Sequence, residues 1–195
     1  MGELRDFEGN AGVWARVNAG KQKFLGSKND FTTFQMGADA KIPVLFNTHA
    51  GLAFSCTDSD LSYVDGSGDN NVYGLAAYAS WLGDSGSFLD LIAKVARVES
   101  DITVAGSHAA YNTNAYSVSA EIGHRFSVTP LVFVEPQLAL SYGHVSGKSF
   151  DTVNRLTQKA VSNRLDGYDS LVGRAGVVTQ CILSEKETLI PILFD

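Results

Sequence analysis

Three carboxylates have the strongest case for chemistry in this chain. Asp90, Glu121 and Glu135 each lie on the polar side of a stretch in which apolar and polar residues alternate. If these stretches are neighbouring strands, the side chains point into one confined space, where crowded carboxylates can share protons and act in acid–base chemistry. The alternative is an ordinary polar face on which the acids pair with cations. Four basic residues lie on such faces: Arg16, Lys94, Arg125 and Arg174.

Other reactive residue types do not form a recognisable site. The four histidines lie in separate segments without the paired spacing of metal ligands. Residues 65–71 resemble the start of a calcium loop, but its twelfth position is Ala76 where such loops have glutamate. Cys56 and Cys181 are too few for a disulfide framework. The sequence therefore predicts neither a metal centre nor a cofactor.

The alternation that positions the carboxylates has a period of two, which is the period of a β-strand. Its clearest form is a hairpin over residues 116–143, in which Tyr116, Val118 and Ile122 share one face while Glu121 lies on the other. About eight strands follow this pattern and none has helical periodicity. They cover residues 13–20, 31–41, 50–57, 72–82, 88–98, 116–126, 132–143 and 170–182.

The connections between these strands favour a membrane barrel. Short connections at residues 43–47, 83–86 and 127–130 alternate with longer polar ones. Such asymmetry is typical of outer-membrane barrels, which have short turns at one rim and long loops at the other. The long connections are residues 24–30, 58–71, 100–114 and 146–168.

The predicted fold is an antiparallel up-and-down transmembrane β-barrel whose apolar face meets lipid. Two alternatives stay open: a soluble β-barrel or β-sandwich whose long loops bind a ligand, and a small self-contained eight-stranded outer-membrane barrel. In the barrel, the polar face lines the pore. The pore-lining residues are predicted to be Arg16, Gln35, Asp39, Lys94, Arg125, Gln137 and Arg174.

Composition restricts the partners and the location. A chain of 195 residues is long enough for one domain, and its net charge of −6 argues against nucleic acid as a partner. No run approaches the ~20 apolar residues that a membrane-spanning helix needs. The first residues, MGELRDFEG, lack the basic region and apolar core of a signal peptide. We therefore expect either a cytosolic protein or a fragment of a longer exported precursor.

Six segments together resemble one family of bacterial proteins. In chain order they are MGELRDFEGNAGVWARV, FTTFQMGAD, SGSFLDLIAKV, SAEIGHRF, VEPQLALSYGHVSG and LVGRAGVVT. Over residues 1–179 the chain resembles the translocator (β) domain of autotransporters, the type V secretion class, and it is nearest to the serine-protease autotransporter group.

The resemblance implies a barrel of about a dozen strands in the bacterial outer membrane. A linker helix passes through its pore and an upstream passenger is exported to the cell surface. Residues 1–10 then form the end of the linker helix, residues 11–182 a partial barrel and residues 183–195 an atypical tail. The family's last strands are expected to be missing, including the terminal strand that the barrel-assembly machinery reads. The implied partners are the chain's own passenger and linker helix, outer-membrane lipid and that machinery.

The resemblance also implies a role for the three carboxylates. Some family members cleave their own linker inside the pore, where an asparagine of the helix cyclises with help from acidic lumen residues and water. Asp90 in FLDLI, Glu121 in SAEIG and Glu135 in VEPQ match the positions of such acids. The asparagine would lie upstream of Met1, so the chain alone is expected not to be an enzyme.

Overall fold

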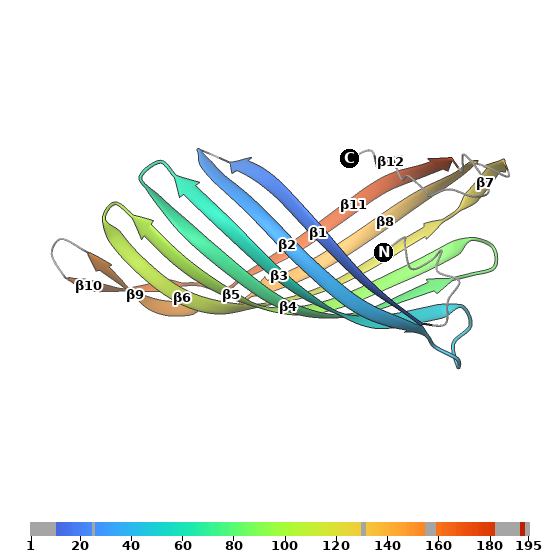
Figure 1. The fold of residues 1–195 in the computed structure, drawn as a ribbon, viewed down its shortest axis with the longest axis horizontal. Helices are drawn as coiled ribbons and strands as arrows, with labels where there is room; N and C mark the ends of the chain where they lie inside the picture. The colour runs from blue at the N-terminus through green and yellow to red at the C-terminus, as the bar shows by residue number, and fades with distance from the viewer. Residues whose placement is uncertain (1–10, 25, 130–131, 155–158, 182–191, 194–195) are drawn as a thin grey trace.

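Alternating residues fold into strands that run antiparallel to their neighbours in a single sheet. A computed structural model describes residues 11–24, 26–129, 132–154, 159–181 and 192–193. Figure 1 shows the strands as one curved layer. In chain order they are β1 (Ala11–Phe24), β2 (Ser27–Lys41), β3 (Thr48–Tyr63), β4 (Gly66–Leu82), β5 (Ser87–Val104), β6 (Ser107–His124), β7 (Phe126–Thr129), β8 (Val132–Val145), β9 (Lys148–Asn154), β10 (Ala160–Leu165), β11 (Tyr168–Cys181) and β12 (Ile192–Leu193).

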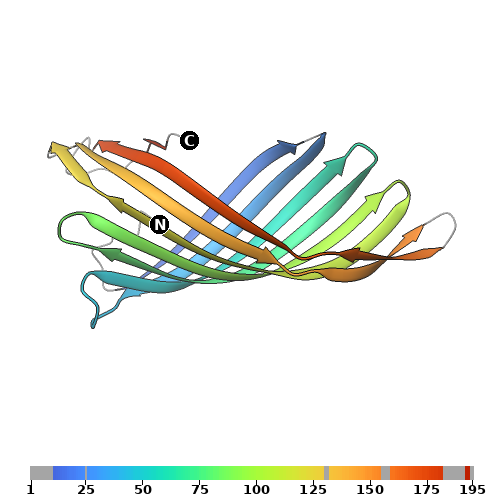
Figure 2. The ribbon, with the colours of Figure 1, turned by 180° about the vertical axis from the view of Figure 1, so that it is seen from behind.

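The predicted all-β antiparallel class is confirmed. The eight predicted strands correspond to β1–β6, β8 and β11, which pair in that order across the sheet. The sheet curls so that β1 and β2 lie in front of β8 and β11 in Figure 1, and behind them when the view is reversed in Figure 2. Among the described residues β1 pairs only with β2, and β11 pairs with β8 and with the two residues of β12. The sheet is therefore open.

Polar and apolar side chains divide between the two faces of this sheet. We call the side enclosed by the curve the inner face and the other side the outer face. Asp90 and Glu135 on the inner face are only 2% and 3% exposed, whereas Leu52 and Leu75 on the outer face are 69% and 61% exposed. This arrangement inverts that of a water-soluble domain, in which large apolar side chains are buried. It fits a sheet with lipid outside and a polar interior.

Three of the four predicted long loops are wrong. Residues 24, 27–30, 58–71 and 100–114 extend the strands, and the last two stretches contain tight turns, such as Ala105–Gly106, where both residues have positive φ. Polar side chains pair across these extensions: the Ser59 hydroxyl donates a 2.6 Å hydrogen bond to Oδ1 of Asn29. Beyond the apolar part of the sheet both strand faces meet water, so a strand there needs no alternation. The sequence signal of the strand therefore ends before the strand does.

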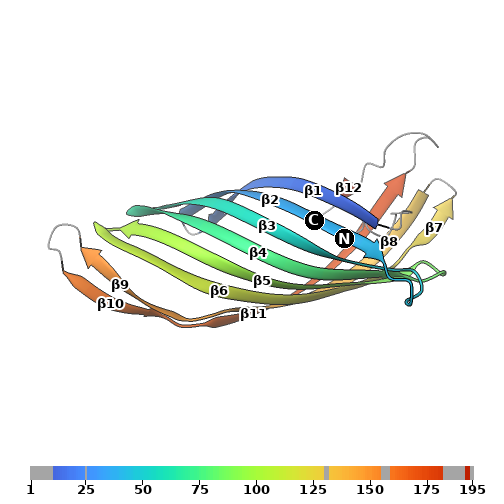
Figure 3. The same cartoon turned by 60° about the horizontal axis from the view of Figure 1, so that its bottom comes forward.

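Two further connections differ from the sequence prediction. Residues 127–129 belong to β7, which pairs with β8, and not to a turn. The predicted loop 146–168 contains the β9–β10 hairpin, which projects beyond the neighbouring hairpins in Figure 3. Tyr111 stacks on Phe150 at 4.5 Å between ring centroids and fixes β9 beside β6.

The chain ends are described only in part. Residues 1–10, predicted as the end of a linker helix, lie outside the described residues. Of the predicted tail 183–195, the structure describes β12, whose backbone pairs with Val178 and Thr179 of β11. Within the described residues, no helix is long and apolar enough to cross a membrane.

Four aspartates form a row across the outer face of the strand extensions. Asp30, Asp60, Asp69 and Asp101 are successive cross-strand partners from β2 to β5. Local desolvation raises the pKa of Asp69 above its ordinary value of 3.8, and a hydrogen bond and repulsion from Asp60, with repulsion from Asp101 and Asp58, raise it further. Like charges on directly opposed residues destabilise a sheet.

We expect the β3–β4 extension to become more stable as the pH falls. Because the folded state binds the Asp69 proton more tightly than the unfolded state, stability falls as the pH rises through the window above 3.8 and is greatest below it. Amide hydrogen exchange of residues 58–71, corrected for intrinsic rates, should show higher protection at acidic than at neutral pH. Asp69→Asn should raise protection at neutral pH and flatten the pH dependence. Equal pH profiles for both proteins would contradict the prediction.

Candidate functional site

Two of the three predicted acids are neighbours on the inner face. Asp90 on β5 and Glu121 on β6 are direct cross-strand partners. The Ser80 hydroxyl donates a 2.5 Å hydrogen bond to Oδ1 of Asp90, and Nη2 of Arg174 lies 3.7 Å from Oε2 of Glu121. Asp90 is almost fully buried and Glu121 is partly exposed. The pair is therefore held by polar contacts from both sides.

Glu135 belongs to a separate ion pair. Nε of Arg125 donates a 2.9 Å hydrogen bond to Oε2 of Glu135, whose side chain is 4% exposed. The guanidinium of Arg125 also lies 4.2 Å from the ring centroid of Phe133. The structure thus places Asp90 and Glu121 together and gives Glu135 its own arginine. For Glu121 and Glu135 the geometry matches the alternative that lumen acids pair with the basic residues named above.

A second polar cluster joins three strands near the β1 edge. Nε1 of Trp14 donates a 2.8 Å hydrogen bond to the Tyr78 hydroxyl, which donates a 3.0 Å bond to Oδ2 of Asp39. Arg16 lies 4.6 Å from the Trp14 ring centroid. The sequence predicted Asp39 and Arg16 as pore-lining residues but not Tyr78. A signal was present in Gly51, where a Cβ would lie 2.6 Å from the Tyr78 hydroxyl, so only glycine lets Tyr78 cross β3 to reach Asp39.

Tyr78→Phe should destabilise the sheet without changing its shape. The substitution removes one hydroxyl and leaves the Trp14 donor and the Asp39 acceptor without that partner in a site where Tyr78 is 7% exposed. We expect a loss of about 2 kcal/mol in the free energy of unfolding. Urea unfolding in detergent micelles measures it. Tyr73→Phe, at an exposed outer-face tyrosine of the same strand, is the matched control and should change stability little.

The remaining predicted pore-lining residues lie on the same inner face. Gln35 pairs across the sheet with Arg16, and Gln137 with Gly123 and Gly176. Lys94 lies beside Gly74, where a Cβ would meet its side chain at 2.6 Å. Small residues surround Lys94 at the middle of the wall. They include Ala53, Ser55, Ala76, Ala96, Ala115 and Ser117. The inner face therefore has mainly small side chains around Lys94 at its middle. Its charged side chains lie mainly toward the end of the sheet that has the short turns.

Sequence comparison places this architecture in a known family. Residues 13–191 match the family "Autotransporter beta-domain". The serine protease EspC of Escherichia coli is 37% identical over 182 residues, which cover 91% of this chain and 14% of that protein. The serine protease SepA autotransporter of Shigella flexneri is also 37% identical over 91% of this chain and 13% of its own length. The chain thus spans about one seventh of the length of these relatives.

Solved structures share the fold. The β-domain of the Bordetella autotransporter BrkA superposes with a TM-score of 0.78 at 25% identity, covering 89% of this chain and 71% of that domain. The translocator domain of NalP from Neisseria meningitidis also gives 0.78, at 20% identity, covering 93% and 65%. These matches favour a translocator over a soluble binding module or a self-contained small barrel. The chain belongs to the autotransporter beta-domain family, whose members are translocators of the bacterial outer membrane.

Proposed function

We propose that this chain forms the wall of an outer-membrane pore. Its own upstream passenger is exported through this pore, and the linker helix lies in the lumen. The observation that carries the proposal is the inversion of the two faces. Exposed leucines and valines meet lipid, while buried carboxylates and the more exposed arginines line the interior. The small residues around Lys94 leave room for a helix at the middle of the wall. The barrel-assembly machinery is the partner expected to insert the strands.

A matched pair of arginine substitutions tests this proposal. Leu75 is on the outer face of β4, and the adjacent Ala76 points to the inner face. A cation on the lipid face of a membrane barrel costs about 2–4 kcal/mol at the bilayer midplane, whereas the lumen tolerates it. Leu75→Arg should therefore reduce vesicle insertion, measured by flotation, and Ala76→Arg should not.

Export itself is tested in the full-length protein with a reporter in place of the passenger. Protease accessibility of the reporter on intact cells should be lost with Leu75→Arg because the barrel is not inserted. Ala76→Arg should leave the barrel in the membrane but narrow its lumen and slow export. A domain that stays in solution without detergent, with both variants behaving alike, would contradict the proposal.

A second candidate function is assistance in cleavage of the linker inside the lumen. The cross-strand pair of Asp90 and Glu121 supports it, because two adjacent carboxyl groups can hold and transfer a proton. Asp90 and Glu121 would position and protonate groups at a linker asparagine, and Glu135 would act through Arg125.

Neutral amide variants separate this role from a purely structural one. In the full-length protein, Glu121→Gln and Asp90→Asn should slow release of the passenger while the barrel still inserts. Glu99→Gln changes an exposed carboxylate that is paired with Arg97 far from this pair, and should leave cleavage unchanged. Normal cleavage in the Glu121 and Asp90 variants would remove this candidate.

A further inference from the structure

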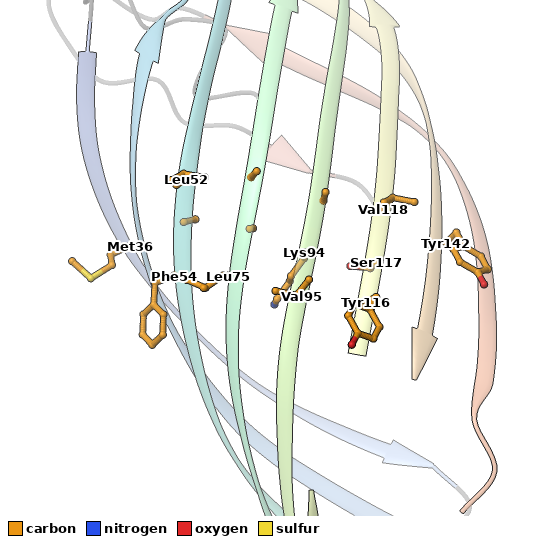
Figure 4. Close-up of a pocket in the computed structure, with 14 residues that line it drawn as sticks. Met36, Leu52, Phe54, Leu75, Lys94, Val95, Tyr116, Ser117, Val118 and Tyr142 are labelled. Atoms are coloured by element: carbon orange, nitrogen blue, oxygen red, sulfur yellow. The ribbon is translucent and has the colours of Figure 1, made fainter. Parts of the chain in front are cut away.

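The outer face contains an apolar groove of about 820 Å³, which is in the size range of ligand-binding pockets. Figure 4 shows its labelled side chains, which come from β2 to β8. The floor is lowest where Ala77 of β4 and Ala93 of β5 lie directly opposite each other. Because both side chains are single methyl groups, the sheet surface is depressed over the width of two strands.

Larger side chains on β3 and β6 form the two walls. Leu52 pairs with Ala77 and Val118 pairs with Ala93, so one row across the sheet reads large, small, small, large. In the next row, Phe54 and Tyr116 flank Leu75 and Val95, and Figure 4 shows the two rings on either side of these residues. β3 and β6 are three strand spacings apart, about 14 Å. This shape fits a linear hydrocarbon chain.

Polar groups lie at the end of the groove nearer the strand extensions. The Tyr142 hydroxyl donates a 2.6 Å hydrogen bond to Asp169, whose Oδ1 is also 2.9 Å from Nδ1 of His144. Arg97 follows Val95 on the same face of β5, about 7 Å farther along the strand. Its guanidinium is half-exposed and pairs with Glu99 through Nε at 2.9 Å, which leaves its other nitrogens able to donate.

We propose that this groove seats one acyl chain of a membrane phospholipid, with the lipid phosphate directed toward Arg97. The inference rests on the proposed membrane location, since the groove is continuous with the exposed apolar face that would meet lipid. Apolar walls bind the chain by contact area, and the arginine at the polar end selects the anionic phosphate. The site is distinct from the lumen, because its large apolar lining side chains, such as Leu52, Phe54 and Val118, are exposed on the outer face.

Filling the groove tests the proposal. The protein is refolded in detergent, titrated with dimyristoylphosphatidylglycerol and analysed by native mass spectrometry to obtain the dissociation constant. The double variant Ala77→Leu/Ala93→Leu displaces part of the acyl chain and should weaken binding about tenfold. The matched control Ala38→Leu/Ala40→Leu adds the same atoms to the outer face of β2, outside the groove, and should bind like the wild type.

The phosphate contact has its own test. Arg97→Gln leaves the groove intact, so it stays informative even if the filled variant does not fold. It should weaken binding of the phospholipid but not of dimyristoylglycerol, which lacks the phosphate. Equal phospholipid binding by the filled variant and the wild type would overturn the proposed binding site in the groove. An equal loss of binding in the filled variant and in the control would overturn it too. Vesicle flotation of the wild type is measured first. Failure of the wild type to insert counts against the proposed function, whereas equal lipid binding by the variants and the wild type counts against the groove site alone.

Discussion

Gly123→Ala should cost about 2–3 kcal/mol in the free energy of unfolding. A Cβ at this position would lie 2.6 Å from Cε1 of Phe88 and 2.6 Å from the backbone oxygen of Pro136. Phe88 is 2% exposed and lies across the β6 backbone at Gly123, so its ring has no free space to enter. The carbonyl of Pro136 belongs to β8 and can move only if the strands separate. Urea unfolding of the chain in micelles measures the loss.

Gly173→Ala is the matched control for this substitution. It also changes a glycine within a strand, but nothing lies within 4 Å of a Cβ at Gly173. Alanine restricts the unfolded chain, so this variant should be neutral or slightly more stable than the wild type. Adding Phe88→Leu to Gly123→Ala should recover part of the loss by removing the ring but not the clash with Pro136. Equal stability of the two alanine variants would show that the packing of the Phe88 ring does not require glycine at position 123.

The sequence was sufficient to assign residues to the two faces of the sheet, because membrane strands alternate strictly between apolar and polar residues where lipid is on one side. Asp90, Glu121 and Glu135 therefore all lie on the inner face, as the period of two predicts. The strand extensions were missed because alternation stops where both faces meet water. Turn chemistry at Ala105–Gly106 was the remaining local signal, and Ala105 is not a residue type that marks a left-handed turn.

Which polar groups contact each other could be predicted only in part. Alternation assigns a residue to a face, but the register between strands decides which of those residues are opposite. The register places Asp90 opposite Glu121. Glu135 lies several residues farther along its own strand from the position opposite Glu121. Contacts that cross an intervening strand, such as Tyr78 with Asp39 over Gly51, depend on side-chain length and on the glycine between them. No period in the sequence encodes such contacts.

Glu135→Leu should destabilise the sheet by about 3 kcal/mol because it removes one partner of a buried ion pair. Glu135 is 3% exposed, and Arg125, which directly follows β6, lies 2.9 Å from it. The substitution leaves the guanidinium in a partly buried position without the carboxylate that neutralised it. Glu135→Gln retains an acceptor oxygen and should lose less than Glu135→Leu. Urea unfolding in micelles gives both values.

A double-mutant cycle decides whether the loss comes from the ion pair. Arg125→Met removes the cation while its side chain can still contact Phe133. If the stranded charge causes the loss, Arg125→Met/Glu135→Leu should be more stable than Glu135→Leu alone, with a coupling of about 1–3 kcal/mol. Additive losses would instead mean that Glu135 stabilises the sheet through other contacts. In that case packing against Phe133 would hold Arg125 in place independently of Glu135.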